Sequence, residues 1–482
     1  MNKKEFREYL QNNIMILDGA TGTQLQKKGM PKGVCPEYWV LEHPDVIIEV
    51  QKEYIHAGSN AVYSCTFGGN RIKLDEFGLG DKVIEINRKL AQLSKKAAGD
   101  DALVAGDLAP TGQFVSPVGE IAFEDMIDIY KEQVQGLLEG GVDFFVIETM
   151  MDIQEARAAV LAVKESCDLP VCVSMTFNEG GRTLTGTDSV TALITLQSMG
   201  VDAVGCNCSA GPQQMLEIIR EMSAVASIPL LAKPNAGLPK LVNGQTVFSM
   251  DADEFGTYTQ GFIDLGVALI GGCCGTAPEY IKQIKRNASE RGPILPKGGK
   301  IRAITSLRKT VYIQEDLPLV LIGKRINTTG EQLFQERLAE GRTDEVLDLA
   351  MDQVDEGAEI VSINGINEKK AMLQVVESIC SMVHVPLCLN TSAPEVIGAA
   401  LRIYPGRALI NSNLSEKEEF ESMLPIAAKY GAMFVLPSVA DETSRENYKI
   451  IQEGYSKAQK YGYEKEDFIV EALALEDIDA RG

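Results

Sequence analysis

The sequence predicts an α/β protein with two successive domains, a closed (β/α)8 TIM barrel followed by a second, TIM-barrel-like βα domain that is incomplete. Two observations support this prediction. Short apolar, β-branched runs that end in small or polar residues alternate with longer segments of helical periodicity. The length of 482 residues also exceeds the size at which one hydrophobic core usually stops growing, so two domains are expected.

Eight predicted strands occur in the first part of the chain, and helical segments separate them. The strands span residues 14–19, 60–67, 102–109, 142–150, 170–177, 201–208, 229–237 and 267–275. The clearest helical segments span residues 45–57, 82–98, 125–140, 153–167 and 212–226. Eight βα units of this length favour a closed barrel over an open, doubly wound sheet. We therefore assign residues 1–290 to a (β/α)8 barrel.

A stretch rich in Gly and Pro, Gly-Pro-Ile-Leu-Pro-Lys-Gly-Gly-Lys, follows the first domain and suits neither helix nor strand. We expect residues 291–318 to form a linker and residues 319–482 to form the second domain. Six strands are predicted there, at residues 319–328, 359–366, 386–392, 408–414, 432–439 and 467–475. A TIM barrel needs eight strands. Either the polypeptide is a fragment that lacks the last two units, or the second domain is an open, reduced relative of the barrel.

Charge and hydropathy exclude several classes of partner. The chain has 46 basic and 68 acidic residues, and this negative field repels phosphate backbones, so no nucleic-acid partner is expected. The polar N-terminus lacks the apolar core of a signal peptide, and no apolar run reaches the roughly 18 residues that span a bilayer. We expect a soluble cytoplasmic protein without a membrane partner, whose ten cysteines remain thiols unless a metal binds them.

Three cysteines lie at predicted strand ends of the first domain, where barrel enzymes carry their reactive residues. Cys208 ends the sixth strand, and Cys273 and Cys274 lie in Gly-Gly-Cys-Cys-Gly-Thr at the end of the eighth. The chain has only three histidines, so a metal site in it depends on sulfur or carboxylate ligands. Thiolates select zinc, and three protein ligands with an open fourth position are typical of a catalytic site. We therefore predict that these three cysteines hold zinc and form the catalytic centre.

The open position of such a site could accept the thiol of a substrate. A free thiol titrates at about pH 8.5, whereas coordination to zinc deprotonates it outright and creates a nucleophile. The glycines on both sides of the cysteine pair permit the backbone conformation that two successive ligands need. We interpret the other cysteines as small buried hydrophobic residues. They are Cys35, Cys65, Cys167, Cys172, Cys206, Cys380 and Cys388.

Four sequence elements of the first domain form a set. They are Asp-Gly-Ala-Thr-Gly-Thr at residues 18–23, Asn-Cys at 207–208 with Gly-Pro at 211–212, Pro-Asn-Ala-Gly at 234–237 and Gly-Gly-Cys-Cys-Gly-Thr at 271–276. Together they resemble the homocysteine S-methyltransferase family, and the resemblance covers residues 1–290. It implies a zinc-dependent methyltransferase that transfers a methyl group to the sulfur of homocysteine and forms methionine.

The same resemblance implies which residues bind the amino acid. They are Asp18, Gly19, Ala20, Thr21, Glu148 and Asn207. Glu148 would meet the ammonium group of the substrate, while backbone amides of the Gly-rich turn suit its carboxylate. Two alternatives stay open: Asp18 as a turn-forming residue, and Glu148 as the ion-pair partner of Arg157 or another base.

The second domain contains Gly-Lys-Arg-Ile-Asn-Thr-Thr-Gly at residues 323–330 and Tyr-Pro-Gly-Arg at 404–407, which leads into Asn-Ser at 411–412. These elements resemble the pterin-binding domain that follows the homocysteine barrel in cobalamin-dependent methionine synthases. The resemblance implies a pterin-like site that includes Asn327, Asn390 and Asn411. This order of domains distinguishes that family from its betaine-using relatives.

Three acidic positions of that family are replaced in this chain. Lys324 stands where glutamate is usual, and Ser362 and Asn390 stand where aspartate is usual. The family's carboxylates accept hydrogen bonds from N–H groups of the pterin ring. Their loss argues against binding of methyltetrahydrofolate with normal affinity. We hypothesise that the second domain binds a different methyl donor or docks a corrinoid protein.

The resemblance favours a methylated corrinoid as the methyl donor. The corrinoid-binding domain of that family carries an Asp-x-His-x-x-Gly element whose histidine ligates cobalt, and this chain lacks that element. Methylcobalamin is therefore expected on another domain or protein. Two alternatives stay open: a methyltransferase that uses betaine or S-methylmethionine directly, and a non-catalytic zinc-binding scaffold that partners a corrinoid protein.

Overall fold

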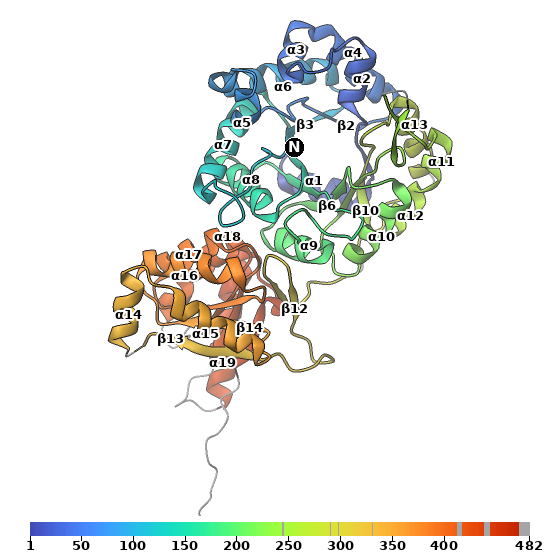
Figure 1. Cartoon of the computed structure of the whole chain (residues 1–482). Coiled ribbons are helices and arrows are strands. Elements are labelled where there is room, and N and C mark those ends of the chain that lie inside the picture. The colour runs from blue at the N-terminus through green and yellow to red at the C-terminus, as the bar shows by residue number, and fades with distance from the viewer. Residues whose placement is uncertain are drawn as a thin grey trace, which may run out of the picture. The chain divides into compact units, whose positions relative to one another are not determined.

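The computed structural model describes residues 1–242, 245–289, 291–296, 298–329, 331–411, 417–437 and 444–471. The chain divides into two compact units, the first ending at Gly299 and the second beginning in the main at Lys300. Both units are α/β (Figure 1). Within the described ranges, no helix has the length and apolar character needed to cross a membrane.

The first unit is a barrel of eight parallel strands with helices around it (Figure 1). The strands are β1 (Met15–Ile16), β2 (Ala61–Tyr63), β3 (Leu103–Leu108), β4 (Phe144–Met150), β5 (Val171–Met175), β6 (Ala203–Asn207), β7 (Leu230–Lys233) and β10 (Val267–Ile270). They pair in the order β2-β3-β4-β5-β6-β7-β10-β1, so neighbours follow the order of the chain except that β1, the first strand, pairs with β10, the last of the eight. Each of the eight predicted strands forms, and the predicted fold class is confirmed.

Helices follow the strands, and one short hairpin is inserted. The helices are α1 (Lys3–Asn12), α2 (Thr21–Lys27), α3 (Pro36–Glu42), α4 (Pro44–Ala57), α5 (Arg71–Asp75), α6 (Val83–Ala98), α7 (Phe123–Gly140), α8 (Ile153–Ser166), α9 (Ser189–Ser198), α10 (Pro212–Ser223), α11 (Ala252–Thr257), α12 (Thr259–Asp264) and α13 (Pro278–Ala288). The hairpin β8 (Pro239–Val242) and β9 (Gln245–Phe248) lies between β7 and α11. Local sequence sets the helix ends: Pro44 begins α4, and Gly58, at φ 118°, ends it in the left-handed conformation.

Side chains help to close the barrel between β1 and β2, because β1 has only two residues. The backbone N–H of Asn60 donates to the Ile16 carbonyl at 2.7 Å, and the Ile16 N–H donates to Asn60 Oδ1 at 3.0 Å. The N–H of Tyr63 donates to Asp18 Oδ2 at 2.8 Å. Polar side chains thus supply hydrogen bonds that a longer β1 would make through its backbone.

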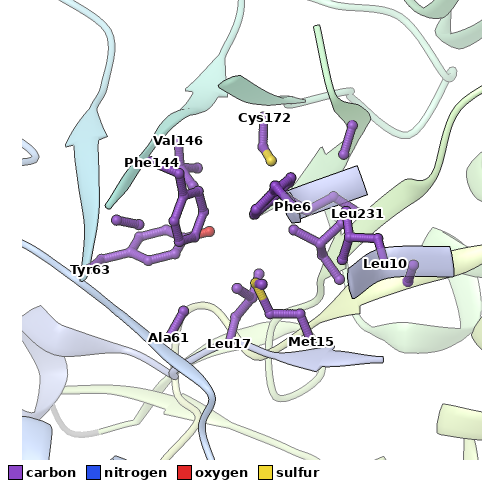
Figure 2. Packing of buried hydrophobic residues seen from close by; sticks show 14 residues of the cluster. Phe6, Leu10, Met15, Leu17, Ala61, Tyr63, Phe144, Val146, Cys172 and Leu231 are labelled. Carbon is purple, nitrogen blue, oxygen red and sulfur yellow. The ribbon is translucent and has the colours of Figure 1, made fainter. Parts of the chain in front are cut away.

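Helix α1 fills the interior of the barrel with apolar side chains. Asn2 and Glu5 cap its start through reciprocal side-chain to backbone hydrogen bonds. Phe6 and Leu10, four residues apart and therefore on one face, are fully buried. Figure 2 shows both among the inward-facing strand residues, and the Phe6 ring lies 5.2 Å from the ring of Phe144, centroid to centroid. This cluster is the apolar part of the barrel interior.

Along β3 and β4 the inward side chains change from apolar to polar toward the carboxyl end. The register pairs Ala105 of β3 with Phe144 of β4, and Asp107 with Val146. Ala105, Phe144 and Val146 belong to the apolar cluster, whereas Asp107, and Glu148 two residues beyond Val146, line a cavity. The carboxyl end of the barrel therefore carries buried acids above an apolar floor, as expected for the functional face of this architecture.

The second unit is a sheet of six parallel strands preceded by a hairpin. The strands are β11 (Ala303–Thr305), β12 (Thr310–Tyr312), β13 (Ile322–Asn327), β14 (Ile360–Asn364), β15 (Leu387–Asn390), β16 (Leu409–Asn411), β17 (Met433–Pro437) and β18 (Phe468–Glu471). Its helices are α14 (Gln332–Ala339), α15 (Asp344–Asp355), α16 (Lys369–Met382), α17 (Pro394–Ile403), α18 (Lys417–Tyr430) and α19 (Ser444–Ala458). Strands β13 to β18 pair in chain order, with β13 and β18 at the two edges of the sheet as described.

All six strands predicted for this unit form, although residues 412–414, 438–439 and 472–475 of those predictions lie outside the described ranges. The segment that we expected to be a linker, residues 291–318, contains the β11–β12 hairpin. Ile304 and Val311 of the hairpin pack in the core of the sheet. The Gly- and Pro-rich composition that indicated a linker ends at Lys300, before the hairpin begins.

The Tyr-Pro-Gly-Arg motif at residues 404–407 holds the hairpin on the sheet. Tyr404 donates its hydroxyl hydrogen to the Thr305 carbonyl at 2.8 Å. The buried guanidinium of Arg407 donates to the carbonyls of Ala303, at 2.8 Å, and Gly431, at 2.9 Å, and pairs with Asp467. Such a buried charge is tolerated because the guanidinium is hydrogen-bonded to carbonyl groups and paired with a carboxylate. The motif therefore has a structural role in this unit.

Replacing Phe6 with alanine should lower the free energy of unfolding of the first unit by about 3–5 kcal/mol, because a fully buried ring is removed. Trp39, the single tryptophan of the chain, lies in α3, so its fluorescence during urea unfolding reports on this unit. Phe77→Ala is the control, since Phe77 is 45% exposed, and it should cost less than about 1 kcal/mol. Equal losses in the two variants would show that α1 contributes little to the core.

Candidate active site

The three cysteines singled out in the sequence come together at the carboxyl end of the barrel. Cys208 follows β6 directly, and Cys273 and Cys274 follow β10 after two glycines. Their sulfur atoms all lie within 4.8 Å of one another, and those of Cys208 and Cys274 are 3.5 Å apart. In the described part of the chain, this is the one group of three or more potential ligands found close enough to hold a metal ion.

The turn after β7 holds both cysteine loops in place. Asn235 accepts a hydrogen bond from the Cys274 N–H through Oδ1, at 3.1 Å, and donates through Nδ2 to the Cys208 carbonyl, at 3.3 Å. The Cys273 N–H donates to the Pro234 carbonyl at 2.8 Å. Cys208 has a φ of 55°, a left-handed conformation that is unfavourable for a residue with a side chain. Asn235 therefore positions cysteine residues from the loops after two different strands.

The glycines beside the cysteine pair are required by close approach. A Cβ atom on Gly271 would lie 2.7 Å from the Asp18 carbonyl oxygen, and one on Gly272 would lie 2.4 Å from the Thr276 side chain. Gly275 has a φ of 83°, the left-handed conformation that glycine adopts most readily. The Gly-Gly-Cys-Cys-Gly-Thr sequence is thus explained by crowding before the cysteines and by backbone conformation after them.

The sulfur cluster fits a zinc ion. Three thiolates bound at about 2.3 Å in tetrahedral geometry would have their sulfur atoms about 3.8 Å apart, which the observed separations allow. Hydrogen bonds from Cys208 and Cys273 lower the pKa of the Cys274 thiol to about 3. The same cluster raises the pKa of Cys208, mainly through its hydrogen bond with Cys273. One thiolate is therefore favoured even among the three sulfur atoms alone, and a cation would be attracted to it.

A cavity of about 510 Å³ lies beside the sulfur cluster. The three cysteines line it, and so do five of the six residues expected to bind the amino acid, namely Asp18, Gly19, Ala20, Thr21 and Glu148. The sixth, Asn207, is fully buried behind the lining. Asn207 donates through Nδ2 to Glu148 Oε2 at 3.1 Å and to Thr149 Oγ1 at 2.7 Å. It therefore orients Glu148 from outside the cavity.

Asp18 forms a buried ion pair with Lys233, which neither of the two readings of Asp18 from the sequence included. The Lys233 Nζ atom lies 2.9 Å from Asp18 Oδ1 and 3.5 Å from the centroid of the Tyr63 ring. Burial lowers the pKa of Lys233, but the carboxylates of Asp18 and Glu148 outweigh that effect, so the net pKa is raised and the amine stays charged. Asp18 is thus a fixed part of the cavity wall.

Glu148 is a buried acid whose surroundings disfavour its charged form. Burial raises its pKa to about 8, although the nearby Lys233 ammonium acts in the opposite direction. A carboxyl group in this state can release its proton when a positively charged group arrives. The position of Glu148 in the cavity is therefore suited to a ligand that carries a cation.

The cavity is also lined by residues that the sequence did not single out as site residues, and four of them are Tyr63, Cys65, Asp107 and Lys233. These four fall at or near the ends of predicted strands, which is the signal that could have found them. Cys65, interpreted from the sequence as a buried hydrophobic residue, is buried as expected but has a φ of 57° and faces this cavity. Strand-end position alone did not separate inward from outward side chains.

In the second unit, asparagines align at the carboxyl ends of neighbouring strands. The register places Asn327, Asn364 and Asn390 side by side on β13, β14 and β15, and Asn411 ends β16. The Asn390 amide donates to Asn364 Oδ1 at 2.9 Å, and the Asn364 amide donates to the Ile326 carbonyl at 3.0 Å. Asn364 is the member that the sequence did not single out. The carboxyl ends of these four neighbouring strands therefore carry neutral amides.

Comparisons with known proteins place both units in families. The homocysteine S-methyltransferase family model matches residues 15–288, more than half of the chain, and the pterin binding enzyme model matches residues 323–471. The methionine synthases of Mycobacterium leprae (strain TN) and Mycobacterium tuberculosis (strain ATCC 25618 / H37Rv) are 28% identical over 470 and 465 residues. Each alignment covers 90% of this chain but 39% of the relative, so the chain spans about two fifths of the relatives' length. The metallated form of the homocysteine methyltransferase MmuM from Escherichia coli is 23% identical, with a TM-score of 0.49, over 57% of this chain and 96% of that one.

Replacing Cys208, Cys273 or Cys274 with serine should remove tightly bound zinc, because each change leaves only two sulfur ligands. Elemental analysis after dialysis should find about one zinc ion per wild-type chain and far less in each variant. Cys206→Ala is the matched control, since Cys206 lies on β6, two residues before Cys208, and is fully buried outside the sulfur cluster. Wild-type zinc content in Cys208→Ser would contradict the assignment.

Proposed function

Because the chain belongs to the homocysteine S-methyltransferase family, we propose that its first unit transfers a methyl group to the sulfur of homocysteine and forms methionine. The observation that carries this proposal is the cluster of three thiols on one wall of a cavity that also holds buried acids. Cys208, Cys273 and Cys274 would hold zinc, which when bound lowers the pKa of an incoming thiol and makes it a nucleophile. A reducing compartment such as the cytoplasm would keep these thiols available.

The cavity offers a complement for each polar group of homocysteine. The sulfur atom would face the cysteines, and the ammonium group would face Glu148, whose carboxyl is oriented by Asn207. The substrate carboxylate would lie against the backbone amides of Gly19 and Thr21, which line the same cavity, whereas the Ala20 N–H donates to Thr276 Oγ1 at 3.2 Å. Lys233 is already paired with Asp18, so it acts on the substrate through its charge and through the fixed shape of the wall.

We infer that the methyl donor is a methylated corrinoid held by another domain or another protein. The curated relatives are methionine synthases, and the pterin binding model matches after the homocysteine barrel, in the order expected from the sequence. The donor and the corrinoid partner belong to the reaction of the whole relatives, and this chain spans only about two fifths of their length. There are two alternatives. The chain could use a direct donor such as betaine or S-methylmethionine, or it could be a non-catalytic zinc-binding scaffold.

An assay of methionine formation from homocysteine separates these functions. With methylcobalamin as donor, the zinc-loaded chain should form methionine, and with betaine or S-methylmethionine it should form none. Cys208→Ser should lose at least about a hundredfold in rate, because the substrate thiol is no longer activated. Product formation with betaine alone would support the alternative donor, and absence of product with all three donors would leave only the scaffold.

We propose that the second unit binds methyltetrahydrofolate only weakly, and that it binds a different methyl donor or docks a corrinoid protein. The supporting observation is the row of neutral amides at Asn327, Asn364 and Asn390, because the resemblance calls for aspartate at position 390. Neutral amides form weaker hydrogen bonds to the N–H groups of a pterin than carboxylates do.

Calorimetric titration of the full chain with methyltetrahydrofolate tests this proposal. Wild type should show no micromolar binding, and Asn390→Asp should bind about tenfold more tightly, because a charge-assisted hydrogen bond replaces a neutral one. Asn178→Asp adds the same charge in the loop between β5 and α9 of the first unit and should leave the affinity unchanged. Micromolar binding by wild type would show that the amide row still accepts the pterin.

A further inference from the structure

Asp107 is a buried acid in the cavity whose carboxyl group lacks an assigned partner. It lies near the end of β3, is 3% exposed, and lines the cavity together with Glu148 and Lys233. Its Oδ1 atom is buried and has no hydrogen-bond partner among the residues that the structure describes. Buried polar atoms in proteins are almost always hydrogen-bonded, so a ligand that supplies a donor at this point is expected.

The backbone of Asp107 is fixed, so its carboxyl group is held toward the cavity. The Asp107 N–H donates to Ser64 Oγ at 3.0 Å, and the Asp107 carbonyl accepts a hydrogen bond from Thr66 Oγ1 at 2.8 Å. The register with Val146 puts the side chain inside the barrel, one layer below Glu148 on the neighbouring strand. Two carboxyl groups therefore line the cavity from adjacent strands.

The charges of the cavity wall favour a cationic ligand. The Lys233 ammonium lies 2.9 Å from Asp18 and also lowers the pKa of Glu148 and of Asp107, so one positive charge is shared among three acids. Burial raises the pKa of Asp107 well above its ordinary value, and the nearby Glu148 raises it further. Both acids are therefore costly to ionise in the empty cavity, and an arriving cation would stabilise their charged forms.

We propose that Asp107 is a substrate-binding residue whose carboxylate accepts a hydrogen bond from the ammonium group of the substrate, so that the site selects thiols that carry an amino group. This inference rests on the proposed function, which places a thiol substrate in the cavity. An ammonium group has three N–H donors, and Glu148 and Asp107 supply acceptors on two neighbouring strands. A thiol without the amino group would leave both buried acids unpaired, which makes the discrimination strong.

The test compares homocysteine with 4-mercaptobutanoate, which keeps the thiol and the carboxylate but lacks the amino group. Calorimetry on the zinc-loaded full chain should show that wild type binds homocysteine at least about tenfold more tightly than the analogue. Asp107→Asn should lose about tenfold in affinity for homocysteine and keep its affinity for the analogue within about twofold. The KM for homocysteine should rise by a similar factor, with kcat little changed, because the contact is made in the bound state.

Asp152→Asn is the matched control. Asp152 is 2% exposed and also has a buried oxygen without a partner, Oδ2, but it does not line the cavity. This variant should leave the preference for homocysteine unchanged. If Asp107→Asn fails to retain zinc or the Trp39 fluorescence of the folded unit, Asp107→Ser takes its place.

The outcomes distinguish this inference from the proposed function. Equal losses for both ligands in Asp107→Asn, or no loss for homocysteine, would overturn the role of Asp107. Equal binding of both thiols by wild type would overturn selection of the amino group while leaving the proposed function intact. Binding of neither thiol to the zinc-loaded wild type would overturn the proposed function itself.

Discussion

Strand order is the constraint on which the first unit depends, because it places β7 between β6 and β10. The three clustered thiols come from the loops after those two outer strands, and Cys208 and Cys274 are 66 residues apart in the sequence. The turn after β7 lies between the two loops, and Asn235 in that turn makes hydrogen bonds to both. The Pro-Asn-Ala-Gly element therefore positions cysteine residues that belong to two other segments of the chain.

The barrel interior divides into two regions with different physical tasks. Phe6 and Leu10 of α1 fill the apolar region and supply burial that stabilises the fold (Figure 2). The region at the carboxyl end holds Asp18, Glu148 and Lys233, and buried charges of this kind stabilise a fold poorly. Their concentration in one layer beside three thiols is better explained by binding than by stability.

The second unit uses the same βα arrangement with a different chemical surface. The Asn390 amide donates to Asn364 and the Asn364 amide donates to the Ile326 carbonyl, so the carboxyl ends of β14 and β15 carry polar groups without charge. Its one deeply buried ion pair, among the described residues, joins Arg407 to Asp467 and fastens the β11–β12 hairpin. In this unit the buried ion pair serves architecture, whereas in the first unit the buried pair of Asp18 and Lys233 lines the cavity.

The sequence by itself determined the βα order, all fourteen predicted strands of the two sheets and the trio of cysteines. These features could be predicted because hydrophobic periodicity and short motifs depend only on residues that are close together in the sequence. It also identified the departures from acidic residues in the second unit. Tertiary structure decided the pairing of Asp18 with Lys233, the place of Asn207 behind Glu148, and the orientation of Asp107 into the cavity. These depend on which strand-end side chains face inward, and that is set by the register and closure of the whole barrel rather than by any one segment.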